Sequence, residues 1–474
     1  AASDVYKRQA LYGANAFNGI LFMRSKSPFD NQGISAYLKR GVTSQESAGT
    51  NDYTDFGIRM AYKFSEKFAA KANFSYLKGT DWFATNLDDK DIRGGTRESN
   101  INYDGVNVYG DNVTQNIRNI APPAFQGLIP DVDVSRNGYE ERDLTDYEAE
   151  SVKADWGLYF RPWEDDFEIQ YVGKVGTGST IFQGAQRYRI DNFSLQQHKL
   201  EVRNDDFFVR GYVTSDKAGD TYIMDVLGPN LLQTWKSHED WFGDYITTYV
   251  GSTIEGATEA EAHAQARKVA ETGRFEPGTP EFEQAFDKVT STTGFLEGSA
   301  IRDNSKIFHG DANYNFGDKI GFAEIQVGGS ARRFRLNSFG TIYTDANGPI
   351  SYSEFGIYTQ LQRSLELNED LELKLTGSVR YDKSELFDGF FSPRISAGLT
   401  VNQNHNFRAS FQTGFRNPDT QALYIGLETA LGNLVGGAFD NGERFVRDYG
   451  VSTFGQSLGL PATITQNGSA AYNN

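Results

Sequence analysis

The clearest pattern of apolar and polar positions lies in residues 52–77. In two runs, 56–64 and 68–76, every even position is apolar, and three polar residues at 65–67 separate the runs. A period of two places these side chains on one face of a β-strand, so the pattern predicts a hairpin. The apolar positions are Phe56, Ile58, Met60, Tyr62, Phe64, Phe68, Ala70, Ala72, Phe74 and Tyr76. Strands of ~9–11 residues can cross a bilayer, but this segment alone fits a soluble β-sandwich equally well.

The same alternation continues along the chain and predicts thirteen strands. We expect a tight reversal at Gly176–Ser179 and a β-bulge near Asp191-Asn192. The expected strands are 33–42, 54–64, 68–77, 154–160, 167–171, 181–202, 207–213, 308–316, one from 320, 355–367, 371–379, 395–401 and 407–415.

The connectors between these strands alternate in length. Every connector after an even-numbered strand is short and polar, whereas the connectors after odd strands include the long segments 78–149 and 216–305. Outer-membrane barrels show this asymmetry of short turns and long outer loops, and a β-sandwich has no reason to keep it. We therefore predict an all-β fold, a partial transmembrane antiparallel β-barrel with about thirteen of the roughly 22 strands of a plugged barrel.

The connector 216–305 carries helical signals that the strands lack. Apolar residues recur every three or four positions from Leu231 to Tyr249. Thr258 and Glu261 form a capping-box pattern before a run that stops at Gly273, and 279–280 reads Thr-Pro at the start of another helix. The sequence thus predicts a long outer loop that contains short helices.

Composition narrows the class of protein. The 474 residues include 14% aromatic residues, no cysteine and no apolar run of 18 residues, so a transmembrane helix is not expected. The absence of cysteine excludes disulfides and thiolate metal sites. A net charge of −17 argues against a nucleic-acid partner, because phosphate binding needs clustered lysine and arginine.

The two ends of the chain are abrupt. The chain opens without methionine, and we interpret residues 1–9 as a non-native leader because AASDVYKRQ is unlike the residues after it. The end, GSAAYNN, is equally abrupt. We expect an internal segment of a longer protein.

Two short motifs resemble one family, the TonB-dependent outer-membrane receptors. The first, YGANAFNGI, contains Tyr12, Gly13, Asn15 and Gly19 and is similar to the end of that family's plug domain. The second, FQTGFRNPDTQALY, resembles its mid-barrel signature and contains Gly414, Phe415, Arg416, Pro418 and Tyr424. The resemblance implies structural roles for these residues. It also implies the end of a plug domain at 10–29 and the first part of a barrel at 30–474.

The resemblance implies a function as well. Family members bind a scarce solute, an iron chelate, cobalamin or an oligosaccharide, and import it with energy from the inner-membrane TonB complex. The expected partners are outer-membrane lipid, TonB through a part of the protein outside this chain, a solute and a surface lipoprotein. The expected location is the outer membrane. A non-transporting surface or adhesion barrel is the alternative.

The residues show no catalytic motif and no cofactor or metal site. None of the five histidines has zinc-protease spacing, and no nucleophile elbow or P-loop is present, so neither an outer-membrane lipase nor another enzyme is expected. Residues 133–138 partly match a calcium loop, but Leu144 stands where the bidentate glutamate belongs. Four aromatic residues of the long connectors could stack on a ligand or form small loop cores: Trp82, Phe83, Trp235 and Trp241.

Overall fold

The structure is a computed structural model. It describes residues 3–4, 13, 20–21, 25–92, 94–163, 166–429, 432–451 and 453–467. Tyr12, Asn15 and Gly19 of the first motif lie outside these residues.

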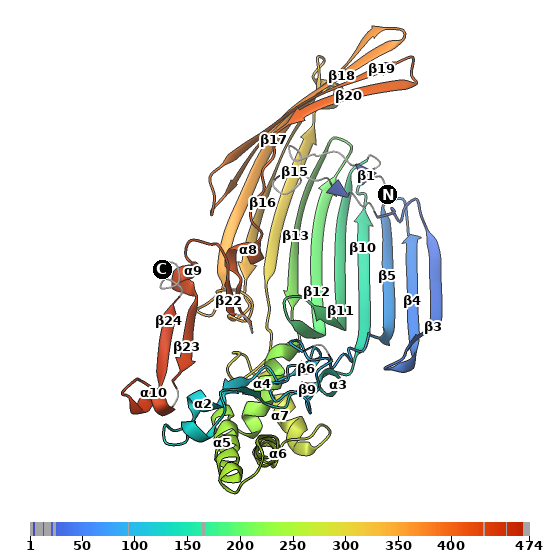
Figure 1. Cartoon of the computed structure of the whole chain (residues 1–474). Helices are drawn as coiled ribbons and strands as arrows, with labels where there is room; N and C mark the ends of the chain where they lie inside the picture. The colour runs from blue at the N-terminus through green and yellow to red at the C-terminus, as the bar shows by residue number, and fades with distance from the viewer. Residues whose placement is uncertain are drawn as a thin grey trace.

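One large antiparallel sheet forms the body of the molecule (Figure 1). Thirteen of its fourteen strands follow one another in a continuous order from β3 to β20, and β14 (Tyr222–Ile223) pairs with β12 beside that path. The predicted number of barrel strands and their antiparallel order are therefore confirmed. The thirteen are β3 (Gly33–Gln45), β4 (Gly49–Lys63), β5 (Phe68–Thr80), β10 (Glu148–Phe160), β11 (Glu168–Gln183), β12 (Arg187–Arg203), β13 (Phe207–Lys217), β15 (Lys306–Asn315), β16 (Glu324–Leu336), β17 (Ile350–Asn368), β18 (Leu371–Ser384), β19 (Phe390–Val401) and β20 (His405–Gln412).

The connectors divide between the two ends of the sheet as the sequence predicts. At one end every connector is a short turn, such as those between β4 and β5 and between β17 and β18. At the other end the two long connectors, 81–147 and 218–305, gather with their helices (Figure 1). We call this end the loop end and the other the turn end.

The predicted reversal at Gly176–Ser179 is wrong, because these residues lie inside β11 and the turn falls at 184–186. A Gly-Thr-Gly-Ser sequence is typical of a turn. Here glycine permits close strand approach instead, since a Cβ on Gly178 would lie 2.4 Å from the Glu150 carbonyl oxygen. The strand predicted over residues 181–202 is therefore β12, and residues 181–183 instead end β11.

The predicted bulge is confirmed. The register between β11 and β12 shifts so that Ser179 faces two residues, Asp191 and Asn192, and Asn192 has a φ of 50°. Two other boundaries differ from the prediction, because β16 begins at Glu324 after a short 3₁₀ turn and β20 ends at Gln412.

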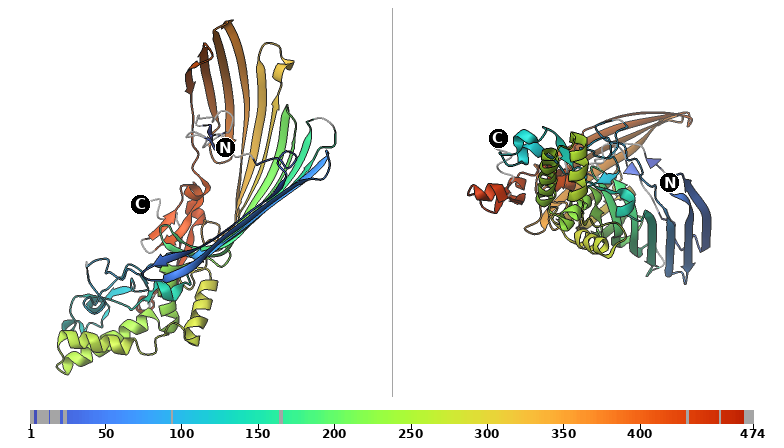
Figure 2. Two further views of the ribbon diagram at one scale, coloured as in Figure 1. Left: turned by 90° about the vertical axis from the view of Figure 1, so that its right-hand side faces the viewer. Right: turned by 60° about the horizontal axis from the view of Figure 1, so that its bottom comes forward.

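The sheet is a single curved layer, as Figure 2 shows from two sides. Its convex face carries the apolar positions, and many of them are exposed: Ile34 is 73% exposed and Phe411 71%. Met60 and Phe74 are also exposed, so they do not point into a dry interior between two layers. The sandwich alternative is therefore overturned, and a lipid-facing surface accounts for the pattern.

The loop elements follow the sequence prediction closely. The capping box of Thr258 and Glu261 is present, Gly273 follows the helix with a φ of 82°, and Pro280 opens the next helix. The helices are α2 (Ile117–Ile120), α3 (Glu141–Leu144), α4 (Met224–Trp235), α5 (His238–Ile254), α6 (Glu259–Ala270), α7 (Pro280–Ser291), α8 (Thr420–Tyr424), α9 (Asn441–Arg444) and α10 (Thr453–Ser457). Across the described residues, no helix has both the length and the apolar character that spanning a membrane requires.

Small strand pairs complete the fold. Ser3–Asp4, in the segment interpreted as a non-native leader, pairs with Ile20–Leu21 as β1 and β2. The remaining strands pair as β6 (Val108–Tyr109) with β9 (Tyr139–Glu140), β7 (Thr114–Asn116) with β8 (Asp133–Ser135), β21 (Gly426–Thr429) with β22 (Gly432–Val435), and β23 (Val446–Gly450) with β24 (Thr463–Asn467).

Candidate functional site

The concave face of the sheet is lined by charged side chains that pair across and along the strands. Arg210 on β13 binds Asp311 on β15 through two hydrogen bonds of 2.6 and 2.7 Å. Arg380 binds Asp382 at 2.8 Å, and Lys199 pairs with Glu201 at 2.7 Å along β12. In a barrel the concave face lines the lumen, and we call it the luminal wall. This wall is polar, and its positive and negative charges balance locally.

The segment before β3 lies against this wall. Lys71 donates a hydrogen bond of 2.8 Å to the Lys26 carbonyl oxygen, and Arg59 donates one of 2.8 Å to the carbonyl oxygen of Asn31. Phe29 is buried with Ala69 and Tyr159. The chain therefore enters the sheet along its concave face, on the same side as β1 in Figure 2.

Gly13 also reaches the wall. Its φ is 86°, and a Cβ at this position would lie 2.9 Å from Nη2 of Arg380. Glycine suits both a left-handed backbone and close approach to a neighbouring group. Among the residues of the first motif, the structure describes Gly13 and Ile20. The structural role of Gly13 in a plug domain stays a prediction.

The second motif directs the chain from the last sheet strand into the loop end. Gly414 to Pro418 come after β20, and the Phe415 ring lies 4.6 Å from that of Phe390. Arg416 is exposed beside Asp419 at 3.9 Å. Tyr424 is buried, with its ring 6.0 Å from that of Tyr352. Phe415 was expected inside the last strand, but it lies in the segment beyond that strand.

At the loop end, the two long connectors fold into one body, which we call the loop module (residues 81–147 and 218–305). Ile117, Ile129 and Val134 from the first connector pack with Trp241 and Tyr245 from the second. A second cluster joins β6, β9 and α3 of the first connector to α4 and α7 of the second. The loops are therefore held by shared hydrophobic cores rather than left as separate excursions.

Three arginines fasten the two connectors to each other. Arg267 of α6 donates hydrogen bonds of 2.8 and 2.9 Å to the carbonyl oxygens of Ile101 and Ser135. Arg274 donates to the Gly138 carbonyl oxygen at 2.7 Å. Arg136 lies 2.6 Å from Nδ1 of His238, and burial lowers the pKa of Arg136 to about 10 and that of His238 to about 4. At neutral pH, His238 is therefore a neutral acceptor for a charged guanidinium.

Sequence reasoning missed these arginines, because nothing in their local sequence identifies distant carbonyl partners. It likewise missed the pair Arg210 and Asp311. Alternation places both residues on the polar face, but the pairing of β13 with β15 spans the whole second connector.

The four aromatic residues of the long connectors have different environments. Trp241 is fully buried and donates a hydrogen bond of 3.0 Å from Nε1 to Glu271, so it forms the loop core and offers no surface to a ligand. Trp235 packs at the edge of both cores. Phe83 stacks on Tyr147 at 4.0 Å between ring centres. Trp82 is 70% exposed, and its role as a ligand contact stays a prediction.

The described residues hold no cluster of three or more histidine, aspartate or glutamate side chains that could bind a metal ion. In the segment that resembles a calcium loop, Ser135 donates to the Tyr103 carbonyl oxygen at 2.8 Å and Asn137 accepts from Arg267 at 2.9 Å. These oxygen atoms are thus used within the loop module.

The polar concave face, the apolar convex face and the folded outer loops define an outer-membrane β-barrel. Residues 96–444 match the family model described as TonB dependent receptor-like, beta-barrel. Because this match spans most of the 474 residues, the chain belongs to that family of outer-membrane receptors.

Several solved structures align with this chain at low sequence identity. The siderophore receptor PirA of Pseudomonas aeruginosa aligns with a TM-score of 0.48 and 12% identity, over 91% of this chain and 54% of that one. A mutant of the ferric enterobactin receptor PfeA of the same organism gives 0.47 and 12%, over 86% and 47%. PirA of Acinetobacter baumannii gives 0.47 and 9%, over 97% and 51%. The chain thus spans about half the length of these structures, and no curated protein matches it.

Proposed function

We propose that this chain is part of a transporter that imports a scarce solute across the outer membrane with energy supplied through TonB. The observation that carries the proposal is the placement of the segment before β3 on the charged luminal wall, through Gly13, Lys71 and Arg59. A barrel of about 22 strands leaks unless its lumen is filled. We propose that residues 10–29 are the end of such a filling domain.

The loop module gives the transporter its outer surface. Its two connectors share cores and arginine contacts, so they present one ordered surface at the mouth of the barrel. Exposed Trp82, at the start of the first connector, is the loop residue we propose to contact the solute. Aromatic faces stack on sugar rings and on aromatic chelators alike.

The test is uptake by cells that produce the full-length protein, with and without TonB. We expect loss of TonB to abolish uptake and to leave surface display unchanged. If uptake or surface adhesion continues unchanged without TonB, the proposal is wrong and the alternative of a non-transporting surface barrel is supported.

The same strains identify the solute class. Radiolabelled iron chelates, cobalamin and oligosaccharides are offered separately, and only one class should accumulate in a TonB-dependent manner. Trp82→Ala is expected to raise the half-saturating solute concentration about tenfold, because a stacking contact contributes roughly 1–1.5 kcal/mol. Co-purification with a surface lipoprotein would accompany oligosaccharide uptake.

A further inference from the structure

The lipid-facing side of β13, β15 and β16 contains a trough of small residues. Gly211, Gly310 and Ala331 lie side by side in register, and Ala312 faces Gly329 in a second row. A Cβ added to Gly211 or Gly310 would meet only a backbone carbonyl oxygen, at 3.7 or 3.8 Å. The surface there is therefore open and without side chains that could fill it.

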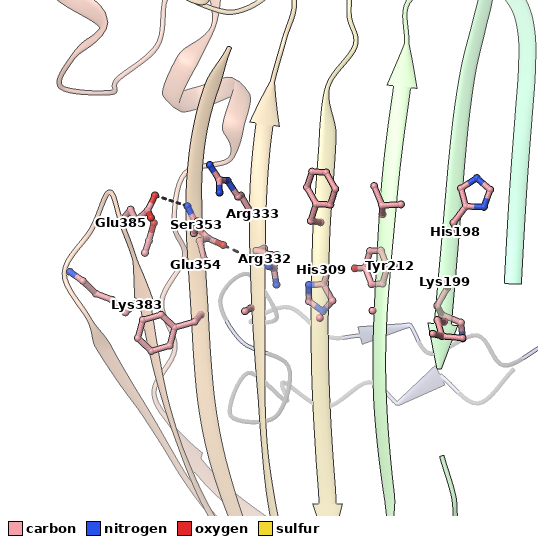
Figure 3. A pocket seen from close by; sticks show the side chains of 18 of the residues that line it. His198, Lys199, Tyr212, His309, Arg332, Arg333, Ser353, Glu354, Lys383 and Glu385 are labelled. Atoms are coloured by element: carbon pink, nitrogen blue, oxygen red, sulfur yellow. Dashed lines mark hydrogen bonds and ion pairs between the residues drawn. The ribbon is translucent and has the colours of Figure 1, made fainter. Parts of the chain in front are cut away.

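Large apolar side chains line the two sides of this trough. Leu200 and Val209 stand on one side, and Phe355 and Ile357 on the other, and each is roughly half exposed. In the second row, Val209 and Ile357 are three strands apart, or roughly 14 Å. The groove has a volume of about 1010 Å³ and extends from β11 to β18 (Figure 3). Such a space is wide enough for more than one acyl chain.

Three cations stand on the same face, between the trough and the loop end. Arg335 lies directly opposite Lys306, and Arg333 is two residues nearer to the trough. Both arginines are exposed, and within the described part of the chain no ion pair is found for any of the three. Like charges directly opposite on a sheet repel each other. Glu385 lines the same groove, but its carboxylate accepts a hydrogen bond of 2.8 Å from the Ser353 amide, opposite Arg333, and forms no ion pair with the three cations. The cluster is therefore open to a further anion.

Near the loop end of β3, β4, β5 and β10, the charged residues of the lipid-facing side do have partners within the protein. On β5 and β10, Lys78 pairs with Glu148 at 2.9 Å, and Arg40 on β3 bonds to Thr54. There the charges near the loop end are satisfied within the protein. The cluster of Lys306, Arg333 and Arg335, which forms no ion pair, is thus a local feature and not a general property of the lipid-facing side near the loop end.

We propose that this trough and its cations bind an anionic, phosphate-bearing lipid of the outer leaflet. The phosphate lies against Lys306, Arg333 and Arg335, and the acyl chains lie along Gly310, Ala331 and their neighbours. This site is separate from the lumen, and it depends on the membrane location of the barrel and not on which solute is transported.

The test uses the full-length protein in detergent micelles and native mass spectrometry, with bisphosphorylated lipid A as the probe and the same lipid without its phosphates as the comparison. We expect the wild-type protein to retain the phosphorylated lipid at least tenfold more tightly. The triple variant Lys306→Ala, Arg333→Ala, Arg335→Ala should lose on the order of a hundredfold in affinity, about fivefold for each cation. Lys78→Ala, in the paired stretch, is the matched control and should bind as wild type.

A third variant, Gly310→Leu, fills the trough and keeps the cations. Its backbone is not left-handed and its Cβ meets no side chain, so the fold should tolerate it. We expect a clear loss of affinity for the phosphorylated lipid. Equal retention of both lipids by the wild type would overturn the proposal, as would equal losses in Lys78→Ala and the triple variant. A dimer that the triple variant abolishes, with no lipid retained, would instead assign the surface to a second copy of the protein.

Discussion

The loop module and the sheet hold the same kinds of apolar residues in opposite environments. In the module, Trp241 and Leu227 are fully buried, inside clusters that join two distant segments of the chain. In the sheet, Ile34, Ile395 and Phe411 are each about 70% exposed, on a face that no other described element covers. The difference lies in the solvent each surface meets, which is water at the loop end and hydrocarbon around the sheet.

This comparison separates two meanings of hydrophobic burial. In the module, apolar side chains leave water by packing on each other, and each large residue stabilises the fold through that packing. In the sheet they leave water by entering lipid, so a neighbouring side chain contributes little and a charge costs much. The two regions should therefore respond differently to the same type of substitution.

The largest effect is expected in the module core. Trp241→Ala removes a fully buried ring and its hydrogen bond to Glu271, and we expect the module to lose about 3–5 kcal/mol of stability. Hydrogen exchange of the amides in residues 101–137 and 238–270 should then approach the rate of an unfolded chain. Trp82→Ala, at a 70% exposed position, is the control and should leave exchange unchanged. Equal protection in both variants would show that the two connectors do not share a core.

A smaller effect is expected on the sheet, and it should depend on the face. Leu361 points outward from β17 and is 41% exposed, whereas its neighbour Gln360 faces the lumen. Leu361→Lys should reduce the free energy of folding into vesicles by about 2–4 kcal/mol, because the ammonium group must enter hydrocarbon. Gln360→Lys should change it by less than about 1 kcal/mol. Similar losses in both variants would contradict the assignment of the two faces.

Much of the sheet could be predicted from the sequence because its signal is local. A period of two, restarted after each polar turn, gave all thirteen strands and the face of each. Glycine was the weak point, since Gly176 and Gly178 serve close strand approach and not a turn. The helices of the second connector were equally predictable from their own caps, as Thr258 shows.

The contacts between distant segments were beyond sequence reasoning. No local pattern indicates that Arg267 binds the carbonyl oxygen of Ile101, or that Trp241 is a core residue and not a ligand contact. The lipid trough was missed for a related reason. Its small residues lie on three different strands, and alternation shows which face each one occupies but not which residues lie side by side.

The smallest effect concerns a buried carboxyl group in the module, Asp111. Its Oδ2 accepts a hydrogen bond of 2.9 Å from the Gly105 amide, and its Oδ1 is buried without a hydrogen-bond partner. Burial raises the pKa of Asp111 to about 6, with Asp104 adding to the rise and Lys90 and Arg97 opposing it. The folded module thus binds a proton more tightly than the unfolded chain does.

Because the pKa is raised on folding, stability should increase as the pH falls from 7 towards 4 and should be lost again as the pH rises through 6. We expect the module to be about 1 kcal/mol more stable at pH 5 than at pH 7 on this account. Asp111→Asn keeps the acceptor for the Gly105 amide and removes this titration, so the change in stability between pH 5 and pH 7 should differ from that of the wild type by about 1 kcal/mol, while the contributions of His238 and Asp303 stay. Asp88→Asn, at an exposed carboxyl group, should keep the pH dependence of the wild type.

The measurement is urea unfolding of the module, monitored by hydrogen exchange at the two pH values. An identical pH dependence in Asp111→Asn and in the wild type would contradict the prediction and would assign the effect to other groups, such as His238 and Asp303.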